Sequence, residues 1–256
     1  MKTNMKTLRQ VLMVALMGGV LASCSDFEED GYSLDKFWVD IATVENPDEK
    51  NVFFLELDDS TLLWTAASAF HNYTPKDGQR VIANYTILAD KRPTGMYDYD
   101  VRLNDVYEVL TKPIFNITPA TQDSIGNDSI EITDKWIGSK YLNIEFAYFG
   151  YDKMHFINLV KDNSKTYTDG KVHLEFRHNS RGDAEMYRRY GVVSFDISSL
   201  IDPTRESVPL VIHVNKPNQA AEQLIELTFR YKNQQPAQVR QVSDTKMSNY
   251  QMATFK

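Results

Sequence analysis

Apolar and polar residues alternate along most of the chain after residue 36, and this period of two is typical of β-strands. In the segment 142–149 every second residue is large and apolar, namely Leu142, Ile144, Phe146 and Tyr148. The alternation returns at 171–177, 193–197, 210–214 and 224–231. Helical signals are confined to 183–189 and 196–200. We therefore expect an all-β protein whose second half has the strand pattern of a β-sandwich.

A first group of strand patterns precedes these segments. They cover 37–44, 52–57, 61–65 and 80–88, and then 101–103 and 106–110 as a strand pair. Asn104 and Asp105 are expected to form the turn within that pair. Proline and polar residues interrupt the pattern between 112 and 130. The sequence therefore predicts two β-domains, at 37–115 and 116–240, and a polar C-terminal tail at 241–256.

The N-terminus has the anatomy of a secretory leader. Three basic residues precede an apolar run at 11–22, which is too short to span a bilayer and fits a signal peptide. Small residues then precede Cys24, which is the one cysteine of the chain and so has no intrachain disulfide partner. We expect a signal peptide at 1–23, cleavage before Cys24, and attachment to the membrane through lipid on Cys24.

The mature chain is expected to be strongly acidic. The full chain has 28 Lys and Arg against 35 Asp and Glu; the leader carries Lys2, Lys6 and Arg9 and no acidic residue, so cleavage changes the formal charge from −7 to −10. This charge argues against nucleic acid as a partner, because phosphates attract clustered Lys and Arg. The segment 24–36 contains the acidic run 26–30 and is expected to be a solvated tether. The run resembles the acidic export signal of Bacteroidetes lipoproteins, which implies the outer membrane and exposure at the cell surface.

Motifs of known enzymes are missing from the sequence. It has no Gly-x-Ser-x-Gly, no phosphate-binding glycine loop and no His-Glu-x-x-His. His173 and His178 are five residues apart in one strand, so they lie on opposite faces and predict no metal site. The polar residues of the strand 171–177 are expected to be solvated. Asp98 and Asp100 can share a strand face as glycosidase carboxylates do, but 35 acidic residues produce such pairs by composition alone. We expect a protein that is not an enzyme and needs no cofactor.

Tyrosines are the candidate ligand-binding residues. Tyr97 and Tyr99 are interleaved with aspartates, and Tyr148 and Tyr151 flank a Phe-Gly pair. Aromatic rings mixed with Asp and Asn can stack on sugars or pack in a protein interface. The alternative is that these rings belong to the core, as most aromatic residues of a β-rich chain must.

The segments 31–44 and 176–183, the second continuing through 190–196, together resemble the NigD-like lipoproteins. This resemblance implies an N-terminal OB-like barrel, a C-terminal β-sandwich and a lipid anchor. The family is named after a gene in a bacteriocin operon, which implies an immunity role. Within 177–183 the residues Asn179, Gly182 and Asp183 are turn formers, so they predict a tight corner between strands, with a ligand site at that corner as the alternative.

Three functions therefore remain open. The first is a non-catalytic binding module of the cell envelope, acting in bacteriocin immunity by capturing a protein. The second is an accessory glycan-binding lipoprotein, in which the tyrosines would contact the sugar. The third is a hydrolase whose carboxylates the sequence does not reveal.

Overall fold

A computed structural model describes residues 36–45, 52–69, 72–90, 95–218 and 221–231. The predicted signal peptide, Cys24 and the C-terminal tail lie outside these residues, as does the acidic tether except for its last residue. The described residues form β-strands connected by loops and two short helical turns. No helix among them is long and apolar enough to cross a membrane.

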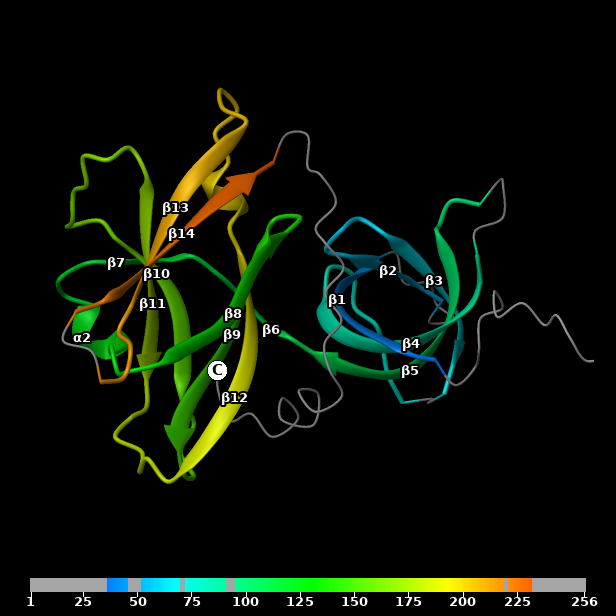
Figure 1. Ribbon diagram of the computed structural model, residues 1–256, viewed down its shortest axis with the longest axis horizontal. Helices are drawn as coiled ribbons and strands as arrows, with labels where there is room; N and C mark the ends of the chain where they lie inside the picture. Colours follow the sequence, from blue (N-terminus) through cyan, green and yellow to red (C-terminus); the bar gives the residue numbers. More distant parts are fainter. Residues whose placement is uncertain (1–35, 46–51, 70–71, 91–94, 219–220, 232–256) are drawn as a thin grey trace, which may run out of the picture. The chain divides into compact units, whose positions relative to one another are not determined.

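The first five strands form a closed barrel in the order β1-β2-β3-β5-β4 (Figure 1). They are β1 (Trp38–Glu45), β2 (Phe54–Leu57), β3 (Leu62–Ser68), β4 (Arg80–Asp90) and β5 (Tyr99–Glu108). β3 and β5 pair in parallel and the other neighbours are antiparallel. Alternate side chains such as Leu55, Leu63 and Val101 are fully buried in the barrel core, as the period of two requires.

The predicted turn at Asn104 and Asp105 is wrong, because β5 runs through both residues as one strand. The pairing of β5 with β4 shifts register next to Asn84. This irregularity interrupts the alternation of apolar and polar residues, and that interruption suggested a turn. Asn104 Nδ2 donates to Asn84 Oδ1 and Thr86 Oγ1 on the neighbouring strand β4, so its polar side chain is satisfied inside a strand.

The remaining strands form two sheets of a sandwich, in the orders β14-β13-β11-β10-β7 and β6-β12-β9-β8. Their bounds are β6 (Leu110–Pro113), β7 (Phe115–Ile117), β8 (Glu131–Gly138), β9 (Tyr141–Gly150), β10 (Phe156–Asp162), β11 (Val172–Asn179), β12 (Tyr187–Asp196), β13 (Ser207–Val214) and β14 (Gln223–Arg230). The core between the sheets is rich in aromatic rings, including Phe146, Phe176 and Phe195. The all-β prediction is confirmed.

Two local expectations need correction and one is confirmed. β6 pairs with β12, so residues 110–113, which we expected in the barrel domain, belong to the sandwich. The segment 183–189 forms no helix: it is a loop that leads into β12, because strand pairing with β9 starts at Tyr187. The expected turn at 196–200 is present as a 3-10 helix at Ser198–Leu200, and a further short helical turn, α2, covers Gln122–Ile125.

A buried polar cluster joins barrel and sandwich residues within the compact unit 34–256. Arg80 is 1% exposed and pairs with Asp58 at 2.8 Å. Asp58 Oδ2 also accepts hydrogen bonds from Trp136 Nε1 and Asn143 Nδ2, both at 2.8 Å. Because a buried cation is stable only when its donors meet acceptors, this set of contacts constrains all four side chains.

Candidate functional site

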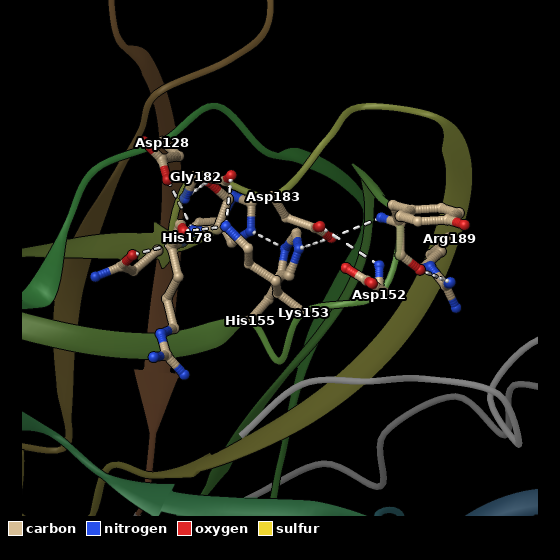
Figure 2. Close-up of polar contacts among 12 residues, drawn as sticks. Asp128, Asp152, Lys153, His155, His178, Gly182, Asp183 and Arg189 are labelled. Atoms are coloured by element: carbon tan, nitrogen blue, oxygen red, sulfur yellow. Dashed lines mark hydrogen bonds and ion pairs between the residues drawn. The ribbon is translucent and has the colours of Figure 1, made fainter.

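Two sandwich strands and two loops bring titratable side chains together at one corner of the sandwich. His155 directly precedes β10 and His178 lies on β11, and the two strands pair so that Ile157 is opposite His178. Asp183 enters from the loop that leads into β12. We call His155, His178 and Asp183 the histidine corner; Figure 2 shows their side chains pointing toward one another.

Hydrogen bonds link the histidine corner in a single chain. His178 Nδ1 lies 3.0 Å from the carbonyl oxygen of Ser129, and His178 Nε2 lies 2.7 Å from His155 Nδ1. His155 Nε2 lies 3.1 Å from Asp183 Oδ2. Both imidazoles are almost completely buried. All four ring nitrogens are thus engaged, and no imidazole nitrogen of this corner is free to take a proton from a substrate.

The chemistry of the acceptors determines where the protons lie. A backbone carbonyl and a carboxylate can only accept, so His178 Nδ1 and His155 Nε2 must both donate. Burial lowers the pKa of His178 to about 4, so this ring is neutral at pH 7 and its Nε2 is an acceptor. The two ring nitrogens of His155 thus lie between His178 Nε2 and the Asp183 carboxylate.

Asp183 is held as an anion by the donors around it. Burial alone would raise its pKa, but the amide of Tyr151, the imidazole of His155 and the amide of Asp152 lower the pKa well below its usual range. The Tyr151 amide donates to Oδ2 at 2.6 Å. Gly150 leaves the room for this contact, because a Cβ atom there would lie 2.9 Å from His155 Nε2 and 3.1 Å from Asp183 Oδ2.

The loop between β11 and β12 forms the tight turn that the sequence predicts. Arg181 and Gly182 both have positive φ, at 56° and 64°. The Ser180 amide and hydroxyl donate to Asp128 Oδ2 at 2.7 and 2.6 Å, and Lys153 Nζ donates to the carbonyl oxygens of both turn residues. Figure 2 shows Lys153 and Asp128 on either side of the turn. The loop is therefore fixed to two neighbouring segments, at Asp128 and at Lys153.

This rigid loop adjoins an exposed aromatic surface. Phe149, Tyr151, Met186 and Tyr187 are each between 45% and 57% exposed at the end of β9 and the start of β12. The rings of Tyr151 and Tyr187 are 6.1 Å apart, and Phe149 is the cross-strand partner of Arg188. We call these four apolar residues the end patch. A pocket of about 480 Å³ lies beside it, with Asp128, His178, Glu185 and Arg188 in its lining.

A second histidine pair lies on the outer face of β11 and β13. His173 Nδ1 is 2.8 Å from His213 Nε2, Asp169 and Glu222 bind the far nitrogens, and the ring of Tyr167 stacks on His173 at 3.5 Å. Among the described residues, no group of His, Cys, Asp or Glu has an arrangement that could hold a metal ion.

The prediction that the polar face of β11 is solvated is wrong, because Glu175 and Arg177 are only 4% and 5% exposed. They pair with each other, and Lys165 Nζ covers Glu175 at 2.6 Å. The sequence did not predict either histidine pair, because His155 lies 23 residues from His178 and His213 lies 40 residues from His173. No local pattern marks such distant pairs.

The four predicted tyrosines do not form one site. Tyr97 is half-buried and packs on the barrel exterior against Trp64, whereas Tyr99 packs against the barrel core. Tyr148 is only 2% exposed within the sandwich core, and Tyr151 belongs to the end patch. The Asp98 carboxylate accepts the Leu62 amide at 2.9 Å, so that aspartate stabilises a loop.

Comparisons with known proteins agree with the observed architecture. The profile of a NigD-like N-terminal OB domain matches residues 41–109, and that of a NigD-like C-terminal beta sandwich domain matches 113–231. A search of curated proteins gave no match. A Bacteroides vulgatus protein of unknown function is 26% identical, with a TM-score of 0.71 over 84% of this chain and 100% of its own.

Two further solved structures are similar. A Parabacteroides distasonis protein described as toxin related is 34% identical and has a TM-score of 0.66 over 85% of this chain and 100% of its own. A NigD-like immunity protein from Bacteroides caccae is 19% identical, with a TM-score of 0.56 over 77% and 93%, and so shares the fold. From the barrel, the sandwich and these matches together, we conclude that the chain belongs to the NigD-like family.

Proposed function

We propose that this protein is a lipid-anchored, non-catalytic binding module of the cell envelope that acts as an immunity protein by capturing a secreted protein toxin. The observation that supports binding most directly is the end patch. Its two tyrosines and one methionine, with Arg181 and Arg188 exposed in the same stretch, have the composition that is enriched in protein interfaces.

The histidine corner supports the same role. Because the His155–Asp183 hydrogen bond and the Asp128 contacts hold the loop before β12, little conformational entropy is lost when a partner binds there. The imidazole nitrogens of the corner are all engaged, which suits a structural part better than a catalytic one. The names of the similar immunity and toxin-related proteins point to a toxin as the partner. Arg188 is already paired with Glu131 at 2.8 Å, so the exposed Arg181 is the cation that favours an acidic group beside an apolar centre on the toxin.

Survival of cells tests this proposal. Cells that carry the full chain should survive a secreted antibacterial protein from a competing strain that kills cells without the gene. Combined Tyr151→Ala and Tyr187→Ala substitutions should remove the protection, whereas Leu224→Ala, which changes an exposed residue of β14, should keep it. Protection that is unchanged by the double substitution, or no protection by the unaltered chain against any killing protein, would disprove the proposal.

Anchoring has a separate test. Cys24→Ser should release the chain from the membrane fraction, and protease added to intact cells should digest the unaltered chain if it faces the outside. Retention of the Cys24→Ser variant in the membrane would contradict lipid anchoring, and protection from protease would contradict the surface location.

A further inference from the structure

The barrel carries a second aromatic surface, which the end patch does not involve. Leu55 and Leu63 point into the barrel core, so Phe54 and Trp64 point outward from β2 and β3, where they are cross-strand partners. The ring of Tyr97 lies 5.3 Å from that of Trp64 and 6.2 Å from that of Phe54. Three half-buried rings thus adjoin on the outside of a closed barrel; we call them the barrel platform.

The barrel platform is preorganised. Tyr97 lies in the loop that precedes β5, and the next residue, Asp98, is fixed to the start of β3. Its amide donates to the Leu62 carbonyl oxygen at 2.7 Å, and its carboxylate accepts the Leu62 amide at 2.9 Å. The position of the Tyr97 ring therefore does not depend on a ligand. A surface that is already ordered loses little conformational entropy when a ligand binds.

Polar groups lie on the same outer face. Asp100 is the register partner of Trp64 across β3 and β5, and Glu56 follows Phe54 on β2. Oδ1 of Asp100 is buried and has no hydrogen-bond partner among the described residues, so only the other carboxylate oxygen is left for a ligand. Arg102 Nε donates to Asn104 Oδ1 further along β5. Aromatic rings with carboxylates on the same face suit a ligand that has both an apolar face and hydroxyl donors.

The charge of the surface distinguishes between two classes of ligand that bind aromatic rings, nucleic acids and sugars. Nucleic-acid bases also stack on such rings, but their phosphates would meet the carboxylates of Glu56 and Asp100 on a chain of net charge −7. A sugar ring without charge has no such penalty. It can pack its C–H face on a ring and donate its hydroxyls to a carboxylate.

We propose that the barrel platform of Phe54, Trp64 and Tyr97, with Asp100 beside it, is a binding site for neutral carbohydrate. The site is distinct from the end patch, so the protein would bind a glycan through the barrel and a protein through the sandwich. The platform includes Tyr97, which is one of the four tyrosines that the sequence singles out.

Tryptophan fluorescence of the full chain in detergent provides the test. The probes are linear gluco-, manno-, galacto- and xylo-oligosaccharides, titrated one at a time, because Trp64 lies in the site and its emission should respond to a sugar. We expect at least one probe to bind, and Tyr97→Ala to weaken it about tenfold or more. Asp100→Asn should weaken it less. Tyr187→Ala is the matched control, a tyrosine of the end patch, and should bind as the unaltered chain does.

Circular dichroism first confirms that each variant is folded. Trp64→Phe, which keeps a ring but removes the fluorescent reporter, should retain part of the affinity in isothermal titration calorimetry. Failure of all four probes to bind would overturn the proposal. Equal affinity of the Tyr97→Ala variant and the unaltered chain would do so too, as would preference for a single-stranded DNA probe over the sugars. Because the protein-binding role is tested at Tyr151 and Tyr187, either proposal can fail without the other.

Discussion

The buried carboxyl of Asp40 should make the barrel less stable as the pH rises, which is the reverse of ordinary acid denaturation. Asp40 is 5% exposed on β1 and accepts a hydrogen bond from Tyr85 Oη at 2.9 Å. Burial raises the pKa of Asp40 from 3.8 to about 6, and the nearby Asp59 and Asp58 add to this, although the Tyr85 hydrogen bond acts against it. The free energy of unfolding must therefore depend on the protonation of this group.

The sign follows from which state holds the proton. Below pH 3.8 Asp40 is protonated in both states and the barrel has its full stability. Between pH 3.8 and 6 the unfolded chain loses the proton while the folded chain keeps it, so stability falls as the pH rises. Above pH 6 the loss is complete and amounts to about 3 kcal/mol, at about 1.4 kcal/mol for each pH unit.

The Asp40→Asn variant removes this dependence, because the amide stays neutral and can still accept from Tyr85. We expect it to unfold like the unaltered chain at pH 4, and at pH 7 to gain up to about 3 kcal/mol in the free energy of unfolding. Urea denaturation at several pH values measures the difference. Trp38 reports barrel unfolding, since its ring stacks on Tyr85 at 6.2 Å.

Comparison at equal pH isolates Asp40 from other titrating groups, which are the same in both proteins. Tyr85→Phe serves as a control: it should lower stability at pH 7, because the ionised carboxylate loses its donor. A constant difference between the Asp40→Asn variant and the unaltered chain from pH 4 to 7 would refute the reasoning.

Three further predictions concern the sandwich. The folded-state pKa of His178 lies at about 4, below the 6.5 of an ordinary histidine, so the sandwich should lose about 3 kcal/mol as the pH falls through that interval. His178→Gln should abolish this acid sensitivity in urea unfolding, and an unchanged profile would contradict the neutral assignment. Asp183→Asn should lower the melting temperature and speed hydrogen exchange of the Tyr151 amide; exchange at the original rate would show that Asp183 does not hold this segment. Gly138→Ala should cost about 1–3 kcal/mol in thermal unfolding, since its Cβ would lie 2.2 Å from Asp58 Cγ, and full stability would mean that the Asp58 and Arg80 contacts yield easily.

Much of the strand content could be predicted because inward and outward side chains alternate locally. The segment 142–149 lies within β9 and the segment 171–177 lies in β11 except for Lys171, with Phe146 and Phe176 buried as their positions require. Errors arose where pairing overrode the local pattern. β5 continues through Asn104 because β4 supplies a hydrogen-bond acceptor for the side-chain amide of that residue. β6 belongs to the sandwich because it pairs with β12. Such partners are remote in sequence and leave no local signal.

The sequence by itself determined the all-β class, the alternation that separates core from surface, and the turn at 179–183, because these depend on the preferences of neighbouring residues. It also singled out Tyr97, but not the rings of Phe54 and Trp64 beside it. Only the tertiary structure decided that His178 meets His155, that Glu175 and Arg177 are buried, and that Tyr148 is core while Tyr151 is exposed. The physical reason is that proton positions, burial and ring contacts are set by which strands pair, and strand pairing joins segments that the chain keeps far apart.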